Sequence, residues 1–106
     1  SKWLAPECLF DNLYTYQSDV WSYGVLLWEI MSVGEAPYPC VSNVETFIQL
    51  GHRMLKPDNC SDQVYELMTQ CWDWESTSRP LFSELMVKVD ILLNKAVIIN
   101  NELYDG

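Results

Sequence analysis

The most informative segment of the chain reads Ser18-Asp19-Val20-Trp21-Ser22-Tyr23-Gly24-Val25-Leu26-Leu27-Trp28-Glu29-Ile30. It contains no proline, and its apolar side chains would cover every side of a helix. A helix that is apolar all round belongs in the middle of a protein, where other elements cover it. We therefore predict a helix from about Gln17 to Ser32, with Ser18 or Asp19 as its N-cap and Gly34 just beyond its end.

The flanking segments predict further helices and no strand. We expect short helices over Ala5–Phe10 and Val44–Leu50, and a longer one over Asp62–Trp72 with Ser61 as its N-cap. A last helix should follow Pro80 and run to about Leu93, because its apolar residues recur at helical spacing. The expected fold class is all-α.

Composition and charge exclude several classes of protein. A chain of 106 residues that is 49% hydrophobic and has five tryptophans carries far too much apolar surface for a disordered segment. Nucleic-acid binding requires clustered basic residues, whereas this chain has a net charge of −9 and six Lys and Arg residues. The apolar run from Val20 to Met31 is shorter than the ~20 residues that cross a bilayer, so we expect no membrane contact within this chain.

The cysteines do not predict a metal site. Cys8, Cys40, Cys60 and Cys71 stand far apart in the sequence, and only His52 accompanies them. A structural zinc site draws its ligands in closely spaced pairs, which this chain lacks. We expect reduced thiols and no bound metal.

Several motifs together resemble those of protein tyrosine kinases. In chain order they are Lys2-Trp3-Leu4-Ala5-Pro6-Glu7, the segment 18–30, Pro37-Tyr38-Pro39, Gly51-His52-Arg53-Met54, Cys71-Trp72, and Arg79-Pro80 followed by Phe82 and Glu84-Leu85. The Lys-Trp pair and Cys71-Trp72 favour tyrosine kinases, and the segments 9–15 and 27–30 look more like receptor than cytoplasmic members. The resemblance implies the C-terminal lobe of a protein kinase-like fold over residues 1–93, incomplete as a domain, and a C-terminal tail over 94–106.

This resemblance assigns roles to several residues. Lys2, Trp3 and Leu4 match the loop that lies under the substrate tyrosine, although Trp3 could instead simply pack on the core. Glu7 and Arg79 match a structural carboxylate–guanidinium pair, with two unrelated surface charges as the alternative.

Further residues carry weaker assignments. Asp19 matches the aspartate that anchors the catalytic loop in this family, although it could serve only as an N-cap. Glu29 needs a partner on so apolar a helix, and the sequence does not identify one. Tyr104 could be a phosphorylation site that recruits a phosphotyrosine-reading domain.

Two residues depart from the family pattern. Cys40 stands where the family usually has glycine, and Leu81 replaces the Ser or Thr that usually precedes Phe82. The missing hydroxyl cap would cost the last helix about 1 kcal/mol. The segment 44–50, which matches a partner-facing helix of kinases, is also slightly shorter than usual.

The motifs of phosphoryl transfer are missing from this sequence. It contains no Gly-rich phosphate loop, no H-R-D and no D-F-G. By resemblance, the parent uses ATP and Mg²⁺ to phosphorylate tyrosines of protein substrates, whereas this chain supplies no catalytic residue and should be inactive alone. A receptor-type parent would lie at the cytoplasmic side of the plasma membrane, and any other parent would be cytoplasmic. A pseudokinase and a helical interaction module remain as alternatives.

Overall fold

The structure is a computed structural model that describes the backbone of residues 1–105 and the side chains of residues 1–92, 94 and 95. Within these residues every regular element is a helix and there is no strand, so the all-α prediction is confirmed. The elements in chain order are α1 (Pro6–Asp11), α2 (Tyr16–Met31), α3 (Val44–Gln49), α4 (Asp62–Cys71), the 3₁₀ turn η1 (Ser76–Ser78) and α5 (Phe82–Asp105).

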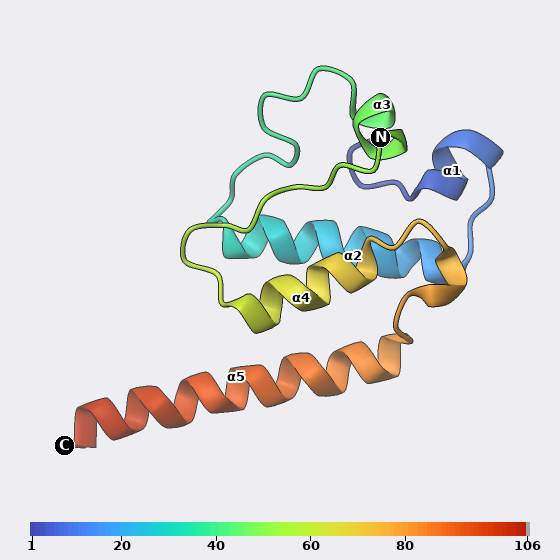
Figure 1. The fold of residues 1–106 in the computed structure, drawn as a ribbon. Coiled ribbons are helices and arrows are strands. Elements are labelled where there is room, and N and C mark those ends of the chain that lie inside the picture. Colours follow the sequence, from blue (N-terminus) through green and yellow to red (C-terminus); the bar gives the residue numbers. More distant parts are fainter. Residues whose placement is uncertain (106) are drawn as a thin grey trace.

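Helix α2 runs through the middle of the fold (Figure 1). It packs along α4, and α5 lies against the opposite side of α4. Helices α1 and α3 contact each other on the far side of α2, and η1 packs against α2. The buried core gathers along α2 and α4, with Trp21, Met68, Trp72 and Leu85 among its largest side chains.

The N-terminus of α2 differs from the prediction. Its N-cap is Thr15, and neither Ser18 nor Asp19 has that role, because Tyr16 and Gln17 are already helical. Ser18 serves the cap from within the helix: its Oγ accepts a hydrogen bond from the Thr15 backbone N–H at 3.1 Å. The cap is therefore one turn earlier than the first obvious polar pair, and Asp19 is not needed for it.

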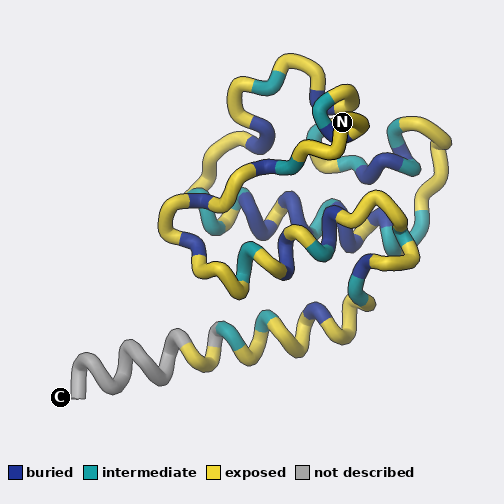
Figure 2. Tube along the Cα trace, in the orientation of Figure 1, coloured by how far each residue is buried: buried dark blue, intermediate teal, exposed yellow. Residues whose placement is uncertain are grey.

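Helix α2 is not covered on every side. Val20, Trp21, Val25 and Trp28 are buried, whereas Leu26 is 48% exposed and Ile30 is 59% exposed. Figure 2 shows buried and exposed residues alternating along this helix. The expectation of complete burial is thus wrong for this chain, since no described element lies over the face that carries Leu26 and Ile30.

Gly24 permits the close contact between α2 and α4. A Cβ atom at this position would lie 2.7 Å from the Cβ of Cys71 and 2.8 Å from Nε1 of Trp72. Both neighbours are buried, so neither can move aside at low cost. The glycine in the central segment is therefore required by packing rather than by backbone conformation.

We predict that Gly24→Ala lowers the free energy of unfolding by about 1–3 kcal/mol, because the added methyl overpacks the α2–α4 contact. Denaturant-induced unfolding followed by tryptophan fluorescence measures the change. Leu26→Ala on the exposed face of the same helix is the control and should cost less. Equal losses at both positions would contradict this account of Gly24.

The start of α4 and the end of α5 can be compared with the predictions. The Ser61 N-cap is confirmed, since its Oγ accepts a hydrogen bond from the Val64 N–H at 3.2 Å. Helix α5 extends to Asp105, past the expected end near Leu93, because no proline or glycine interrupts the sequence before Gly106. The assignment of 94–106 as a tail outside the domain remains a prediction.

The loop between α2 and α3 holds residues with unusual backbone angles. Val33, Tyr38 and Cys40 have φ of +60°, +54° and +64°, in the left-handed region that glycine adopts most readily. Cys40 is exposed, whereas Tyr38 is 2% exposed and packs into the core. The backbone at Cys40 thus keeps the conformation expected of a glycine.

We predict that Cys40→Gly raises the free energy of unfolding by about 0.5–1 kcal/mol, since it relieves the left-handed strain without removing a buried contact. Thermal unfolding measures this gain. Tyr38→Gly, at a similar φ, should instead be destabilising because it removes a buried ring. A loss of stability with Cys40→Gly would show that the thiol makes a contact worth more than the strain.

Candidate functional site

The Lys2-Trp3-Leu4 loop is held on the surface of α2. The Ser22 hydroxyl donates a hydrogen bond to the Trp3 carbonyl at 2.7 Å, and the Trp3 indole N–H donates one to the Glu29 carboxylate. Leu4 packs against the core, while Trp3 stays 45% exposed. The structure therefore gives Glu29 the partner that the sequence did not identify. Trp3 is anchored at its N–H and leaves part of its ring open to solvent.

An open cleft borders this loop. It has a volume of about 560 Å³ and is lined by Lys2 and by residues 35–42 of the α2–α3 loop. Pro37, Tyr38 and Pro39 from the predicted motif belong to this lining. Two motifs that are 33 residues apart in sequence, counted from Leu4 to Pro37, thus meet beside the same cleft.

The structure brings Glu7 and Arg79 together in a two-pronged ion pair. Arg79 Nη1 donates to Glu7 Oε2 at 2.7 Å, and Nη2 donates to Oε1 at 2.9 Å. Ser18 adds a third hydrogen bond to the same carboxylate, at 2.9 Å from Oε2. The Arg79 side chain is fully buried and that of Glu7 is 12% exposed. This geometry fixes the direction of the pair as well as its charge.

The remaining donors of Arg79 bind backbone carbonyls. Nη1 donates to the Gln17 carbonyl and Nε to the Asp73 carbonyl, each at 2.9 Å. One side chain therefore joins α1, the first turn of α2 and the loop before η1. Because its polar atoms are all directed at acceptors, the cost of burying the guanidinium is offset.

A second arginine, Arg53, completes this cluster and was not among the predicted site residues. Both guanidinium groups lie over the Trp21 ring, with Cζ of Arg53 5.1 Å and Cζ of Arg79 5.2 Å from the ring centroid. Arg53 also donates to the Trp72 carbonyl at 2.9 Å. The sequence could have drawn attention to Arg53, because this residue belongs to the Gly51–Met54 motif. A single arginine in a sequence does not, however, identify the aromatic ring on which it packs.

The environment of Glu7 favours its ionised form. Burial acts most strongly and would raise its pKa, but hydrogen bonds from Arg79, the backbone and Ser18, with the Arg79 charge, together lower it below 4.5. A carboxyl with a lowered folded-state pKa stabilises the fold at neutral pH. That contribution is lost as the pH falls through the lowered value.

We predict that Glu7→Gln lowers the free energy of unfolding by roughly 3–5 kcal/mol at neutral pH, since it leaves the Arg79 charge buried without its counter-ion. The loss should shrink as the pH falls through the lowered pKa of Glu7, where the wild-type carboxyl of the folded protein also becomes neutral. Denaturant unfolding over this pH range measures both effects. Asp62→Asn, which removes an exposed pair with Lys56, is the control and should cost little at any pH.

Asp19 lies apart from the Glu7–Arg79 cluster. It is exposed, and in the described part of the chain its side chain has no hydrogen-bond partner. Its spacing to Leu26 and Ile30 places these three residues along one side of α2. A carboxylate and two apolar side chains thus form the uncovered face of the central helix.

No metal site is present in the part of the chain that the structure describes, because no three His, Cys, Asp or Glu residues come together. The four cysteines are unpaired. None of the described helices is long and apolar enough to pass through a bilayer. Tyr104 lies outside the described side chains, so its predicted phosphorylation is untested.

Comparison with known proteins identifies the family. The family model described as protein tyrosine and serine/threonine kinase matches residues 1–89. The chain belongs to this family. The predicted tyrosine kinase resemblance and the C-terminal-lobe fold are thereby confirmed, and the chain is a fragment of a kinase domain.

The relatives are receptors. Fibroblast growth factor receptor 1 of Xenopus laevis is 49% identical over 106 residues, which is 98% of this chain and 13% of that protein. Platelet-derived growth factor receptor alpha of Rattus norvegicus is 56% identical over 95 residues, or 87% of this chain and 9% of that protein. The human form of this receptor is 54% identical over the same length. The kinase fragment thus spans only about a tenth of the length of these relatives.

Proposed function

We propose that this kinase fragment positions protein substrates for a receptor-type tyrosine kinase, whose complete domain transfers the γ-phosphate of ATP to tyrosine. The observation that carries the proposal is the anchored loop: Ser22 and Glu29 fix Trp3 on α2, and Lys2, the residue before it, lines the cleft. Phosphoryl transfer depends mainly on positioning, so a rigid apolar shelf under the phenol is a useful contribution. The identities of about 50% to growth factor receptors support the receptor type.

The cofactors of the complete domain would be ATP and Mg²⁺, held by segments outside these residues. Within this chain, Glu7 and Arg79 would be structural and Asp19 would hold the catalytic loop. The exposed side of α2 supports this role for Asp19, since it offers a free carboxylate together with Leu26 and Ile30. An element laid on this face would bury the two apolar side chains and find an acceptor for its backbone N–H groups.

The similarity to growth factor receptors also suggests the location and the partners of the complete protein. Its kinase domain would lie on the cytoplasmic side of the plasma membrane, and its partners would be protein substrates that carry tyrosine. Phosphorylated Tyr104 would recruit a phosphotyrosine-reading domain through a basic pocket on that partner. A pseudokinase or an independent helical module is less well supported, because similarity extends over nearly the whole chain to receptor kinases.

We predict that Trp3→Ala in the complete kinase raises KM for a tyrosine peptide about tenfold, equal to ~1.4 kcal/mol, and leaves KM for ATP unchanged. Steady-state peptide phosphorylation measures both constants. Val87→Ala is the control, because Val87 is an exposed apolar residue of α5 that does not line the cleft. If the two variants behave alike, Trp3 has no special role in substrate binding.

We predict that the purified 106-residue chain does not transfer phosphate from ATP to a tyrosine peptide. Radiolabelled ATP provides the assay, and the complete domain is the positive control. The reason is that the chain lacks the phosphate loop and the catalytic and metal-binding aspartates. Tyrosine phosphorylation by the chain at a rate above a no-protein blank would refute the assignment of the chemistry to other segments.

A further inference from the structure

A cavity outside the substrate loop combines aromatic walls with acidic side chains. It has a volume of about 370 Å³ and lies between α1, α3 and the loop that leads into η1. Phe10 and Trp74 form two of its walls, with ring centroids 6.1 Å apart and planes tilted by 34°. They are 41% and 45% exposed, so each ring has area available for a ligand. This volume can hold a side chain or a small molecule.

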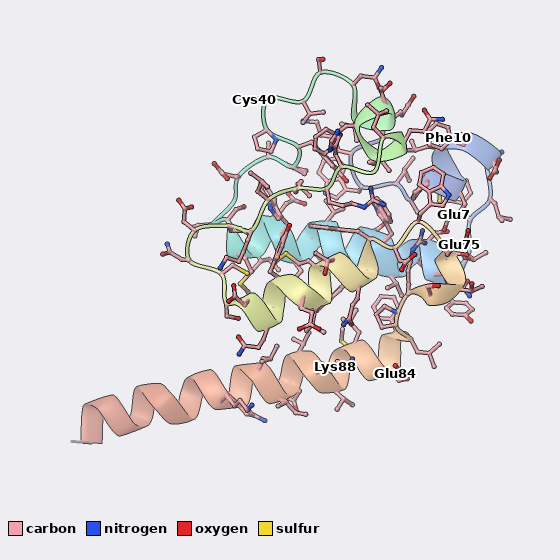
Figure 3. The ribbon with its side chains drawn as sticks, in the orientation of Figure 1. Glu7, Phe10, Cys40, Glu75, Glu84 and Lys88 are labelled. Carbon is pink, nitrogen blue, oxygen red and sulfur yellow. The ribbon has the colours of Figure 1, made fainter. Side chains whose placement is uncertain are left out.

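The polar lining of this cavity is acidic. Asp11 and Glu75 line it, are exposed and form no ion pair in the described part of the chain. Glu7 also reaches the cavity, but Arg79 already binds its carboxylate from the protein side. No Lys or Arg belongs to the lining, and the whole chain carries a net charge of −9. Figure 3 shows Glu7, Phe10 and Glu75 on the same side of the molecule.

The chain itself shows which cation such a surface accepts. Arg79 combines an aromatic face, that of Trp21 at 5.2 Å, with the Glu7 carboxylate. The lining of the cavity contains the same two groups, an aromatic ring from Trp74 and a carboxylate from Glu75. A planar guanidinium can stack on the ring while it donates to a carboxylate, whereas an ammonium offers no plane for stacking.

We propose that this cavity binds an arginine side chain of a protein partner. Its location separates it from the cleft beside Lys2, so the inference does not depend on the substrate-binding role proposed for Trp3. The chemistry is recognition only, through stacking on Phe10 and Trp74 and hydrogen bonds to Asp11 and Glu75.

The test uses the complete kinase domain that contains this chain, labelled with ¹⁵N-tryptophan so that the Trp74 indole signal reports on the cavity. The probe is a capped tripeptide with arginine in the middle, and its matched control carries citrulline, which has the same shape without the charge. We expect a saturable shift of the Trp74 signal with arginine, a weaker response with lysine and none with citrulline. Equal shifts with arginine and citrulline would overturn the proposal.

Three variants separate the site from general attraction to an acidic protein. Glu75→Gln and Phe10→Leu lie on different walls of the cavity, and each should weaken arginine binding about threefold to fivefold. Glu84→Gln removes an exposed carboxylate of α5 outside the cavity and should leave binding unchanged. If Glu84→Gln weakens binding as much as Glu75→Gln, the protein attracts the peptide only through its net charge, and the proposal fails. Because the two cavity variants change different elements, unfolding of one still leaves the other as a test.

Discussion

The buried guanidinium of Arg79 is the constraint on which the rest of this structure depends. A charge with no exposed surface requires an acceptor for its donors, and four hydrogen bonds reach Glu7, the Gln17 carbonyl and the Asp73 carbonyl. These acceptors belong to three segments that are distant in sequence. The fold must therefore bring α1, the start of α2 and the loop before η1 to one point, since any other arrangement leaves the charge without partners.

The same constraint extends to the loop Lys2-Trp3-Leu4. Glu7 is held by Arg79 and Ser18, which fixes the first turn of α1 against α2. The Lys2-Trp3-Leu4 loop directly precedes that turn, and Ser22 and Glu29 then bind it one and three helical turns further along α2. The position of the Trp3 ring is thus defined from both ends. A loop held at both ends is suited to orienting a substrate, because little of its entropy remains to be lost on binding.

The sequence predicted those features that depend on local patterns or on several motifs in order. Helical spacing and the Ser61 cap located α4, and the motif order related Glu7 to Arg79 across 72 positions. It did not predict the Thr15 cap, because two consecutive polar residues further on offered a more obvious start. The sequence also could not predict the hydrogen-bond partner of Glu29. A hydrogen bond between residues 26 positions apart leaves no periodic signal in a single sequence.

The exposed side of α2 carries apolar residues, and these indicate that another element covers this side in a larger assembly. A helix that needed to face water would carry polar residues there, yet Leu26 and Ile30 are about half exposed in this chain. Burying these two side chains would stabilise an assembly by roughly 1.5–3 kcal/mol each at full burial, a gain that requires a covering element. Asp19 lies on the same side, about two turns before Leu26. An acidic group next to an apolar surface suits a polypeptide segment, which brings apolar side chains and backbone N–H groups together. Apolar ligands alone would leave the carboxylate without a donor.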